Sequence, residues 1–210
     1  MIDDDTAERF SNYMKKYPKL YSYLAEIVKK YSSSNSPFII DLGVGAGLLS
    51  KELYTQISSA KILGVDPNDK MLKLAKKNVD FPGFEVKKGS SENIPSSDSS
   101  VDIVVSRFSL AYWKNPKESF KEIYRVLRKD GFLILEAINK DFPSWRLFLI
   151  KIHMLFNKAG FDVTKYHVDV YKKAYTISQV ESFLLDSDFS IVEKQGDKKD
   201  WKFLIIGKKN

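Results

Sequence analysis

A short apolar run followed by three alternating glycines constrains this chain more than any other feature of its sequence. The run Phe38–Leu42 comes directly after Pro37, and its length and β-branched residues predict a buried strand. Gly43, Gly45 and Gly47 follow, and beyond them the apolar residues recur at helical spacing. Glycines allow a ligand to approach the backbone closely, and the first turn of a helix offers unpaired N–H groups. The stretch therefore predicts the strand, loop and helix that open a nucleotide-binding unit.

The spacing of the glycines separates two kinds of nucleotide site. A dinucleotide fingerprint, G-x-G-x-x-G or G-x-G-x-x-A, requires a small residue where this chain has Leu48. The loop instead reads D-x-G-x-G-x-G, beginning at Asp41. This difference argues against a nicotinamide-dependent oxidoreductase, which stays open as an alternative function.

The composition predicts a single globular domain that spans residues 1–210. A length of 210 residues, with 43% hydrophobic and 29% charged residues, is ordinary for one such domain. Because the chain has no cysteine, it has no disulfide, thiolate metal site or cysteine nucleophile, and we expect no metal site. No apolar run reaches the roughly 18 residues of a membrane span. The acidic residues Asp3–Asp5 are unlike a signal peptide, so we expect a cytoplasmic protein.

The net charge of +7 raises the question of a nucleic-acid substrate. Only five of the 34 basic residues are arginine, the side chain best suited to bidentate phosphate binding. The lysines are scattered among 27 acidic residues rather than gathered in one basic run. We therefore expect no nucleic acid among the partners, and an enzyme directed at RNA stays an alternative.

Further apolar runs alternate with helical patterns along most of the chain. Parallel strands are predicted at 61–65, 84–87, 101–106 and 132–137. A helix that begins at Pro116 is predicted to end at 129–131, where basic residues precede a glycine. The runs at 189–194 and 201–206 flank a glycine-led polar turn, which predicts an antiparallel hairpin. The order predicts an α/β fold with a doubly wound, mostly parallel sheet.

Two helical segments fall outside this alternation. Residues 6–31 form a helical leader interrupted at Pro18, whose aromatic side chains either pack in the core or form a lid. Residues 140–175 form an insertion whose densely apolar part, 145–156, is too short to span a bilayer. Since a surface helix normally has a wider polar face, we expect this insertion to be a helical cap over the site. Extra core and a homodimer contact are the alternatives.

These motifs, taken in order, resemble the class I S-adenosylmethionine-dependent methyltransferases, and most of all methyltransferase type 11, the ubiquinone and menaquinone biosynthesis type. Besides the loop that begins at Asp41, residues 89–95 resemble the G-D-A-E-x-L-P of that family, and residues 122–131 resemble its E-x-x-R-V-L-K-P-G-G. The resemblance implies a seven-stranded Rossmann-like sheet that ends in an antiparallel hairpin. It also implies an enzyme that uses S-adenosylmethionine, releases S-adenosylhomocysteine and methylates a small-molecule acceptor, apolar or aromatic, by in-line transfer. A non-catalytic protein that binds S-adenosylmethionine is a further alternative.

The resemblance assigns the cofactor to the loops that follow the first four strands. Asp66 lies about 20 residues beyond the glycines, where such units have the acid that binds the ribose hydroxyls. Asn68 fits the cap of the next helix better than Asp66 does. The family usually has aspartate in place of Ser90, so this hydroxyl or the Ser91 N–H would face the adenine amine. The cofactor residues implied are Asp41, Gly43, Val44, Gly45, Gly47, Asp66, Pro67, Met71, Ser90, Ser91, Glu92, Arg107 and Phe108.

The acceptor side of the site is predicted from aromatic and titratable residues. Aromatic faces stabilise a nearby sulfonium, and the candidates for this face or for a lid are Tyr13, Tyr17, Tyr112, Trp113 and Trp145. Arg107 begins the loop after the fourth strand, and it is expected to meet a carboxylate of cofactor or substrate, or else to pair within the chain. In-line transfer needs a general base only where the acceptor carries a proton at neutral pH. The candidates for that base are His153, His167 and Asp141.

Overall fold

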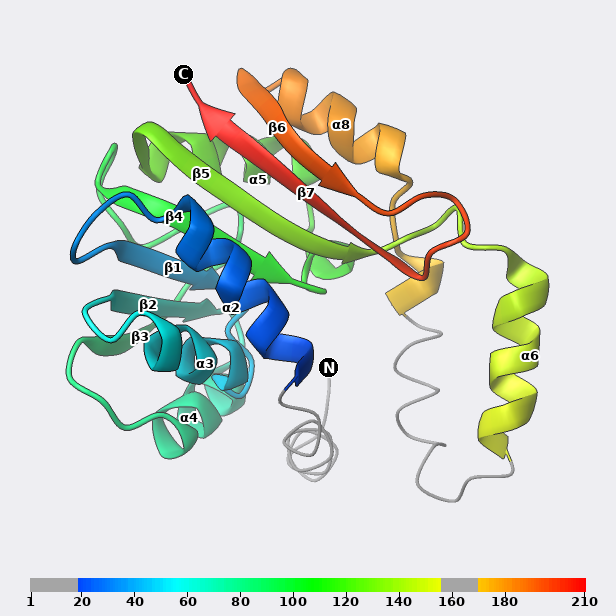
Figure 1. Cartoon of the computed structure of the whole chain (residues 1–210), viewed down its shortest axis with the longest axis horizontal. Helices are drawn as coiled ribbons and strands as arrows, with labels where there is room; N and C mark the ends of the chain where they lie inside the picture. Colours follow the sequence, from blue (N-terminus) through cyan, green and yellow to red (C-terminus); the bar gives the residue numbers. More distant parts are fainter. Residues whose placement is uncertain (1–18, 156–169) are drawn as a thin grey trace.

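The computed structural model describes residues 19–155 and 170–210, and its centre is one seven-stranded sheet (Figure 1). The strand order is β3-β2-β1-β4-β5-β7-β6, in which β7 pairs antiparallel with both β5 and β6 and the other pairs are parallel. The strands are β1 (Phe38–Leu42), β2 (Lys61–Asp66), β3 (Phe84–Lys88), β4 (Val101–Arg107), β5 (Leu127–Ile138), β6 (Phe189–Gln195) and β7 (Lys202–Lys209). This topology confirms the predicted doubly wound sheet with its C-terminal hairpin.

Helices cover both faces of the sheet. The helical elements are α2 (Lys19–Tyr31), α3 (Leu48–Gln56), α4 (Asp69–Asn78), the 3-10 turn η1 (Leu110–Tyr112), α5 (Pro116–Val126), α6 (Ser144–Leu155) and α8 (Ile177–Leu185). Figure 1 shows α2 and α3 in front of the sheet and α5 and α8 behind it. Neighbouring strand residues alternate between the two cores: Ile39 packs with the α2 side and Ile40 with the α5 side. Both faces of the buried parallel strands β1, β2 and β4 are therefore apolar, as their continuous hydrophobic runs predicted, whereas the edge strand β3 is mostly exposed.

The carboxyl ends of the parallel strands meet at one edge of the sheet. In Figure 1 the arrowheads of β1, β4 and β5 point toward the side on which the start of α2 and the whole of α6 lie. Ligands bind beyond this edge in sheets of this type, where the strand order reverses between β1 and β4. The fold thus brings the loops after β1, β2 and β4 together although they are far apart in sequence.

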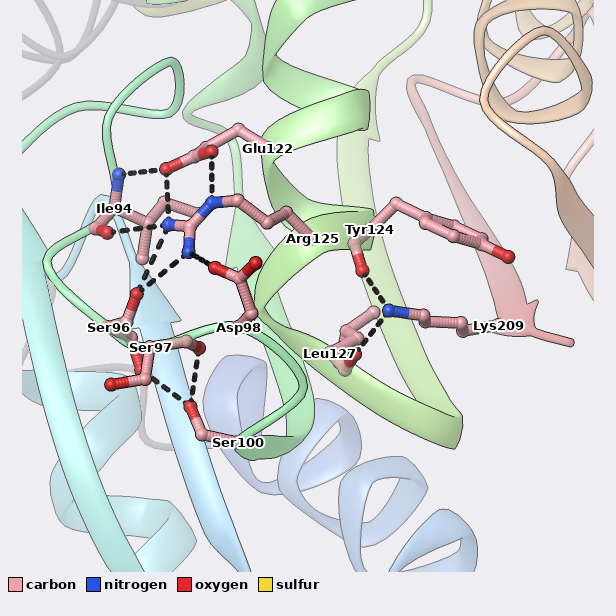
Figure 2. A network of polar contacts seen from close by, with 10 residues as sticks. All are labelled: Ile94, Ser96, Ser97, Asp98, Ser100, Glu122, Tyr124, Arg125, Leu127 and Lys209. Atoms are coloured by element: carbon pink, nitrogen blue, oxygen red, sulfur yellow. Dashed lines mark hydrogen bonds and ion pairs between the residues drawn. The ribbon is translucent and has the colours of Figure 1, made fainter.

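The end of α5 differs from the sequence prediction. The helix ends at Val126 and β5 begins at Leu127, three residues before the expected stop at 129–131. Leu127 has an extended backbone and pairs with Val101 in β4, which draws the chain out of the helix early. Lys209 Nζ donates to the carbonyl oxygens of Tyr124 and Leu127, each at 2.7 Å, and so satisfies acceptors that the helix end leaves free (Figure 2).

The predicted insertion, residues 140–175, begins with a helix as expected, but several apolar side chains of this helix are exposed to solvent. The helix α6 confirms the helical pattern, and Phe142 and Leu147 at its start are buried. Trp145 is 61% exposed, however, and Phe148 and Leu149 are exposed as well, so these three side chains are not part of the core. No helix in the described ranges is long and apolar enough to cross a membrane.

Candidate cofactor site

The glycine loop follows β1 and packs against the end of β2. One of its three glycine positions faces open space. Gly43, Gly45 and Gly47 all have positive φ, at 80°, 52° and 79°, a region that other residues enter only with strain. A Cβ at Gly43 would lie 2.6 Å from Ser109 Cβ, and one at Gly47 would lie 2.6 Å from Val79 Cγ2. The nearest atom to a Cβ at Gly45 would be 3.9 Å away. Gly43 and Gly47 therefore serve packing, whereas Gly45 faces space that a ligand can fill.

Asp41 lies beneath this loop and does not face the open space. Asp41 is 2% exposed, and its carboxylate accepts a hydrogen bond of 2.7 Å from Ser50 Oγ in α3. Burial raises the pKa of Asp41 to about 7, an effect that outweighs the opposing hydrogen bond from Ser50. Asp41 thus anchors the first turns of α3 under the loop.

Asp66 connects the end of β2 directly to the glycine loop. Its Oδ2 accepts from the Gly45 N–H at 3.1 Å, and its Oδ1 accepts from the Asn68 N–H at 2.9 Å. Burial raises its pKa, against the lowering effect of these two backbone hydrogen bonds. Because each carboxylate oxygen has two acceptor sites, Asp66 can still accept ribose hydroxyls. The cap of α4 is Asn68, as predicted, since its side chain accepts from the Lys70 N–H.

Three other residues implied for the cofactor lie around this pair. The side chain of Val44 is buried against α4, so only its backbone can meet a ligand. Pro67 is exposed and Met71 is half-buried, both beside Asp66 at the start of α4. These positions agree with a ligand that binds in the open space beside Gly45.

The loop after β4 is held against the glycine loop by a chain of hydroxyl groups that sequence reasoning missed. Ser106 Oγ donates to the Leu42 carbonyl at 2.8 Å, so it must accept from Ser109 Oγ, and Ser109 Oγ in turn accepts from the Trp113 indole N–H at 3.0 Å. Each donor in this series of hydrogen bonds therefore has a single acceptor. Trp113 is only 8% exposed and packs edge-to-face on Phe120, so its predicted place in a lid is wrong: it is a core residue that orients Ser109.

The loop after β3 contains the three residues predicted to flank the adenine. The backbone of Ser90 pairs with Asn93, and Ser91 is buried. Glu92 Oε1 accepts from the N–H groups of Lys114 and Asn115, at the start of α5. Burial alone would raise the pKa of Glu92, but the hydrogen bonds outweigh it and the pKa is lowered. Glu92 thus joins this loop to α5, and its carboxylate is largely occupied by the chain itself.

Arg125 holds the remainder of the connection between β3 and β4 in place (Figure 2). Residues 89–100 of this connection contain no helix. Its guanidinium binds Glu122 through two nitrogens, at 2.7 and 2.8 Å, and also donates to the carbonyls of Ile94 and Ser96 and to Asp98. The hydrogen bonds from Arg125 lower the pKa of Glu122, whose Oε1 also accepts from the Ile94 N–H. Glu122 and Arg125, the E-x-x-R part of the sequence motif, therefore hold the loop after β3 in place. This loop begins with the residues predicted to flank the adenine.

Arg107, the last residue of β4, has a carboxylate partner within the chain. Its Nε donates to Glu136 Oε2 at 2.8 Å, and its guanidinium carbon lies 4.7 Å from the ring centroid of Tyr21 and 4.2 Å from that of Phe108. Phe108 has a positive φ of 56° and donates its N–H to the Glu136 carbonyl. Lys202 completes the group by donating to the other oxygen of Glu136. Sequence reasoning did not include Glu136, although a charged residue inside an apolar strand is a recognisable signal.

A narrow apolar crevice, too small to admit a water molecule, lies beyond the ends of β4 and β5. It is lined by Phe108, Leu110, Ala111, Ala137, Ile138, Val170, Ala174 and Tyr175. Tyr112 is half exposed nearby, with Lys173 Nζ at 5.6 Å from its ring centroid. Residues 170–175 therefore lie against the loop after β4, on the side predicted for the acceptor. A wider hollow of about 710 Å³, between β3 and residues 95–100, contains none of the predicted site residues.

Of the predicted general bases, only Asp141 has a side chain that the structure describes. Asp141 lies in the turn after β5, where its N–H donates to Asn139 Oδ1 at 2.9 Å. His153 is on α6, but its side chain is not among those described, and Tyr13, Tyr17 and His167 lie outside the described residues. Trp145 is exposed beside Arg146. In the part of the chain that the structure describes, no three His, Asp or Glu side chains gather into a metal site.

Comparison with known proteins agrees with this fold. Residues 40–135 match the family model described as a methyltransferase domain. The demethylmenaquinone methyltransferase of Chlorobaculum parvum is 27% identical over 83% of this chain and 71% of that protein. The enzyme of the same name from Lactobacillus johnsonii is 36% identical over 57% of this chain, which spans only about half (51%) of that relative. A structure from Methanococcus maripaludis, assigned as an S-adenosyl-L-methionine-dependent methyltransferase, superposes with a TM-score of 0.72 and is 26% identical over 99% of this chain and 93% of that one.

The sheet order, the glycine loop joined to Asp66 and these relatives define the chain as a class I S-adenosylmethionine-dependent methyltransferase, with S-adenosylmethionine as its cofactor. Within that class, residues 40–135 match the methyltransferase domain family, and the chain is similar to demethylmenaquinone methyltransferases.

Proposed function

We propose that this enzyme transfers the methyl group of S-adenosylmethionine to a small apolar or aromatic acceptor. The observation that carries the proposal is the Gly45–Asp66 hydrogen bond under an open space, at the edge where β4 and β5 also present an apolar crevice. A quinol ring is the acceptor class that the names of the relatives favour. The enzyme is proposed to act in the cytoplasm on a free metabolite.

The residues present fit the cofactor. The Gly45 backbone offers close approach, Asp66 retains acceptor capacity for ribose hydroxyls, and Ser90 with Ser91 would flank the adenine. When bound, S-adenosylmethionine supplies a methyl group on a sulfonium, a good leaving group in an in-line displacement. The chain then has two tasks, which are to hold the donor and to align the acceptor.

The acceptor is proposed to enter over the ends of β4 and β5. Phe108, Ala137 and Tyr175 line an apolar wall there, and half-exposed Tyr112 offers an aromatic face for the sulfonium. We propose that residues 140–175 act as a cap that excludes water from this region, within a single domain whose leader covers residues 6–31. Residues 170–175 already contact the loop after β4, which supports the cap. The exposed apolar side chains of α6 are also compatible with a homodimer.

The test combines binding with transfer. We expect calorimetry to show that S-adenosylhomocysteine binds and that NADH does not. With tritiated S-adenosylmethionine, reduced 1,4-naphthoquinone is expected to gain label, and a bulk RNA sample is not. Binding of NADH in place of S-adenosylhomocysteine would refute the cofactor assignment. Labelling of RNA but of no quinol would refute the acceptor class.

The cap has a test of its own. Deletion of Lys140–Tyr175, with the ends rejoined by a glycine-serine linker, is expected to leave S-adenosylhomocysteine binding measurable and to abolish transfer. The cap proposal is wrong if the shortened enzyme methylates its acceptor at the parent rate.

A further inference from the structure

The first turns of α6 reverse the usual arrangement of a surface helix. Leu147 is buried at 6% exposure, whereas Trp145, Phe148 and Leu149 are 61%, 62% and 54% exposed. Positions 145, 148 and 149 are spaced i, i+3 and i+4, so they share one face of the helix, and Leu147 lies on the opposite face. A surface helix normally presents polar residues to solvent. The solvent side of α6 is instead an apolar face, which is typical of a surface that binds a partner.

The start of α6 is held by two other segments of the chain. Phe142 packs edge-to-face on Trp201, with the ring centroids 5.3 Å apart, and Trp201 stacks on Tyr171 at 5.9 Å. The Tyr171 hydroxyl donates to the Phe142 carbonyl at 2.9 Å, and Arg146 Nη1 donates to the Lys199 carbonyl at 3.3 Å. From this base α6 extends beyond the edge of the sheet (Figure 1). The apolar face is therefore carried on a helix whose base is fixed to the body of the protein.

Basic side chains gather around this base. Residues 139–149, 170–175 and 196–201 together contain six basic and three acidic residues. Two of the acids, Asp197 and Asp200, accept N–H groups within their own turn, at 2.6 and 2.9 Å. Four of the basic side chains are exposed, and they are Lys172, Lys173, Lys198 and Lys199. The apolar face thus stands beside a surface with an excess of positive charge, which favours an anionic partner.

An anionic lipid surface matches both properties of this region. A helix with one apolar face and basic neighbours lies in the plane of a membrane interface, where tryptophan is a preferred residue and lysines meet the headgroups. We propose that α6 docks this protein on an anionic membrane surface, with Trp145, Phe148 and Leu149 inserted at the boundary of the acyl chains. The contact is peripheral, because the 12 residues of α6 are too few to span a bilayer. This inference goes beyond the proposed function and requires neither cofactor nor acceptor.

Sedimentation with vesicles tests the docking on the full chain. Vesicles of phosphatidylcholine with one third phosphatidylglycerol are expected to bind the parent protein, and pure phosphatidylcholine vesicles are expected to bind it about tenfold more weakly. Trp145→Ser/Phe148→Ser is expected to lose about tenfold in affinity for the anionic vesicles, because it removes the two rings that enter the lipid. Lys198→Gln/Lys199→Gln is expected to weaken binding to the anionic vesicles by about tenfold at low salt and to leave binding to the neutral ones unchanged.

Tryptophan fluorescence reports which side of the protein meets the lipid. Of the three tryptophans, Trp113 is buried and Trp201 is half-buried, so Trp145 is the one whose surroundings change most on docking. The parent emission is expected to shift to shorter wavelength when anionic vesicles are added. Trp145→Phe is expected to keep the vesicle affinity and to lose the shift, since phenylalanine preserves the apolar face.

Matched controls lie elsewhere on the surface. Leu185→Ser removes an apolar side chain that is 60% exposed on α8, and Lys73→Gln/Lys76→Gln removes two exposed charges on α4, which Figure 1 places away from α6. Both controls are expected to bind vesicles as the parent does. Because every replaced side chain except that of Trp145 in the fluorescence variant changes from exposed apolar or charged to exposed polar, all variants are expected to keep the Tm of the parent.

Three results would overturn the inference. The first is a parent protein that does not bind the anionic vesicles, and the second is an equal loss of binding in Leu185→Ser and Trp145→Ser/Phe148→Ser. The third is gel filtration that shows a parent dimer, split by Trp145→Ser/Phe148→Ser, without vesicle binding, because the apolar face would then belong to a second copy of the chain. Vesicle binding by a protein that does not bind S-adenosylhomocysteine would refute the proposed function and leave this inference standing.

Discussion

Two glycines of one loop are expected to respond to the same substitution in opposite ways. Gly43→Ala places a Cβ 2.6 Å from Ser109 Cβ at a φ of +80°. The left-handed backbone costs about 1–2 kcal/mol and the overpacking about 1–3 kcal/mol more, so we expect a loss of about 2–5 kcal/mol in the free energy of unfolding. In a chain of this size that corresponds to a fall of roughly 4–20 °C in Tm. Gly45→Ala meets no close atom, so only the strain of about 1–2 kcal/mol applies.

Binding should follow the reverse order. The Cβ of Gly45→Ala occupies the space assigned to the cofactor, so we expect it to lose S-adenosylhomocysteine affinity far more than stability. Urea unfolding and calorimetry on both variants measure the two effects separately. In a double-mutant cycle, Gly43→Ala and Ser109→Gly should show a coupling of about 1–3 kcal/mol, because Ser109→Gly removes the clashing atoms. The cycle subtracts the separate cost of Ser109→Gly, which takes a hydrogen-bond partner from Ser106 and Trp113. If Gly43→Ala proved no less stable than Gly45→Ala, and the cycle showed no coupling, the packing argument would be refuted.

Three further predictions follow from the site. Asp66→Ala should weaken S-adenosylhomocysteine binding by about 1–3 kcal/mol, whereas the cap variant Asn68→Ala should lower stability by about 1 kcal/mol and leave the affinity unchanged in calorimetry. Because burial raises the pKa of Asp41 to about 7, the folded state holds a proton that the unfolded state releases near pH 4, so stability should fall from about pH 4 to pH 7. Asp41→Asn should flatten that part of the urea-measured profile, and an unaltered slope would contradict the assignment. Arg125→Met should loosen residues 94–98 and destabilise the chain by about 1–3 kcal/mol, with faster amide exchange there than in the surface control Lys121→Met.

Local patterns in the sequence determined the succession of strands and helices, the glycine loop and the cap at Asn68. A strand buried on both faces is a continuous apolar run, a turn at positive φ requires glycine, and a helix cap needs a short polar side chain, so each signal lies within a few residues. The wrong boundary at the end of α5 shows the limit of such signals. Leu127 fits a helix locally, and only its pairing with Val101 in a neighbouring strand places it in β5.

The tertiary structure alone decided which polar and aromatic residues have partners. Trp113 and Tyr112 are adjacent in sequence, yet one is a core residue bound to Ser109 and the other is half exposed. Arg107 finds Glu136, 29 residues away, because β4 and β5 are neighbours in the sheet. A side chain's environment is set by segments that meet only when the chain folds. Burial, ion pairing and raised pKa values therefore depend on long-range packing, which the local sequence does not contain.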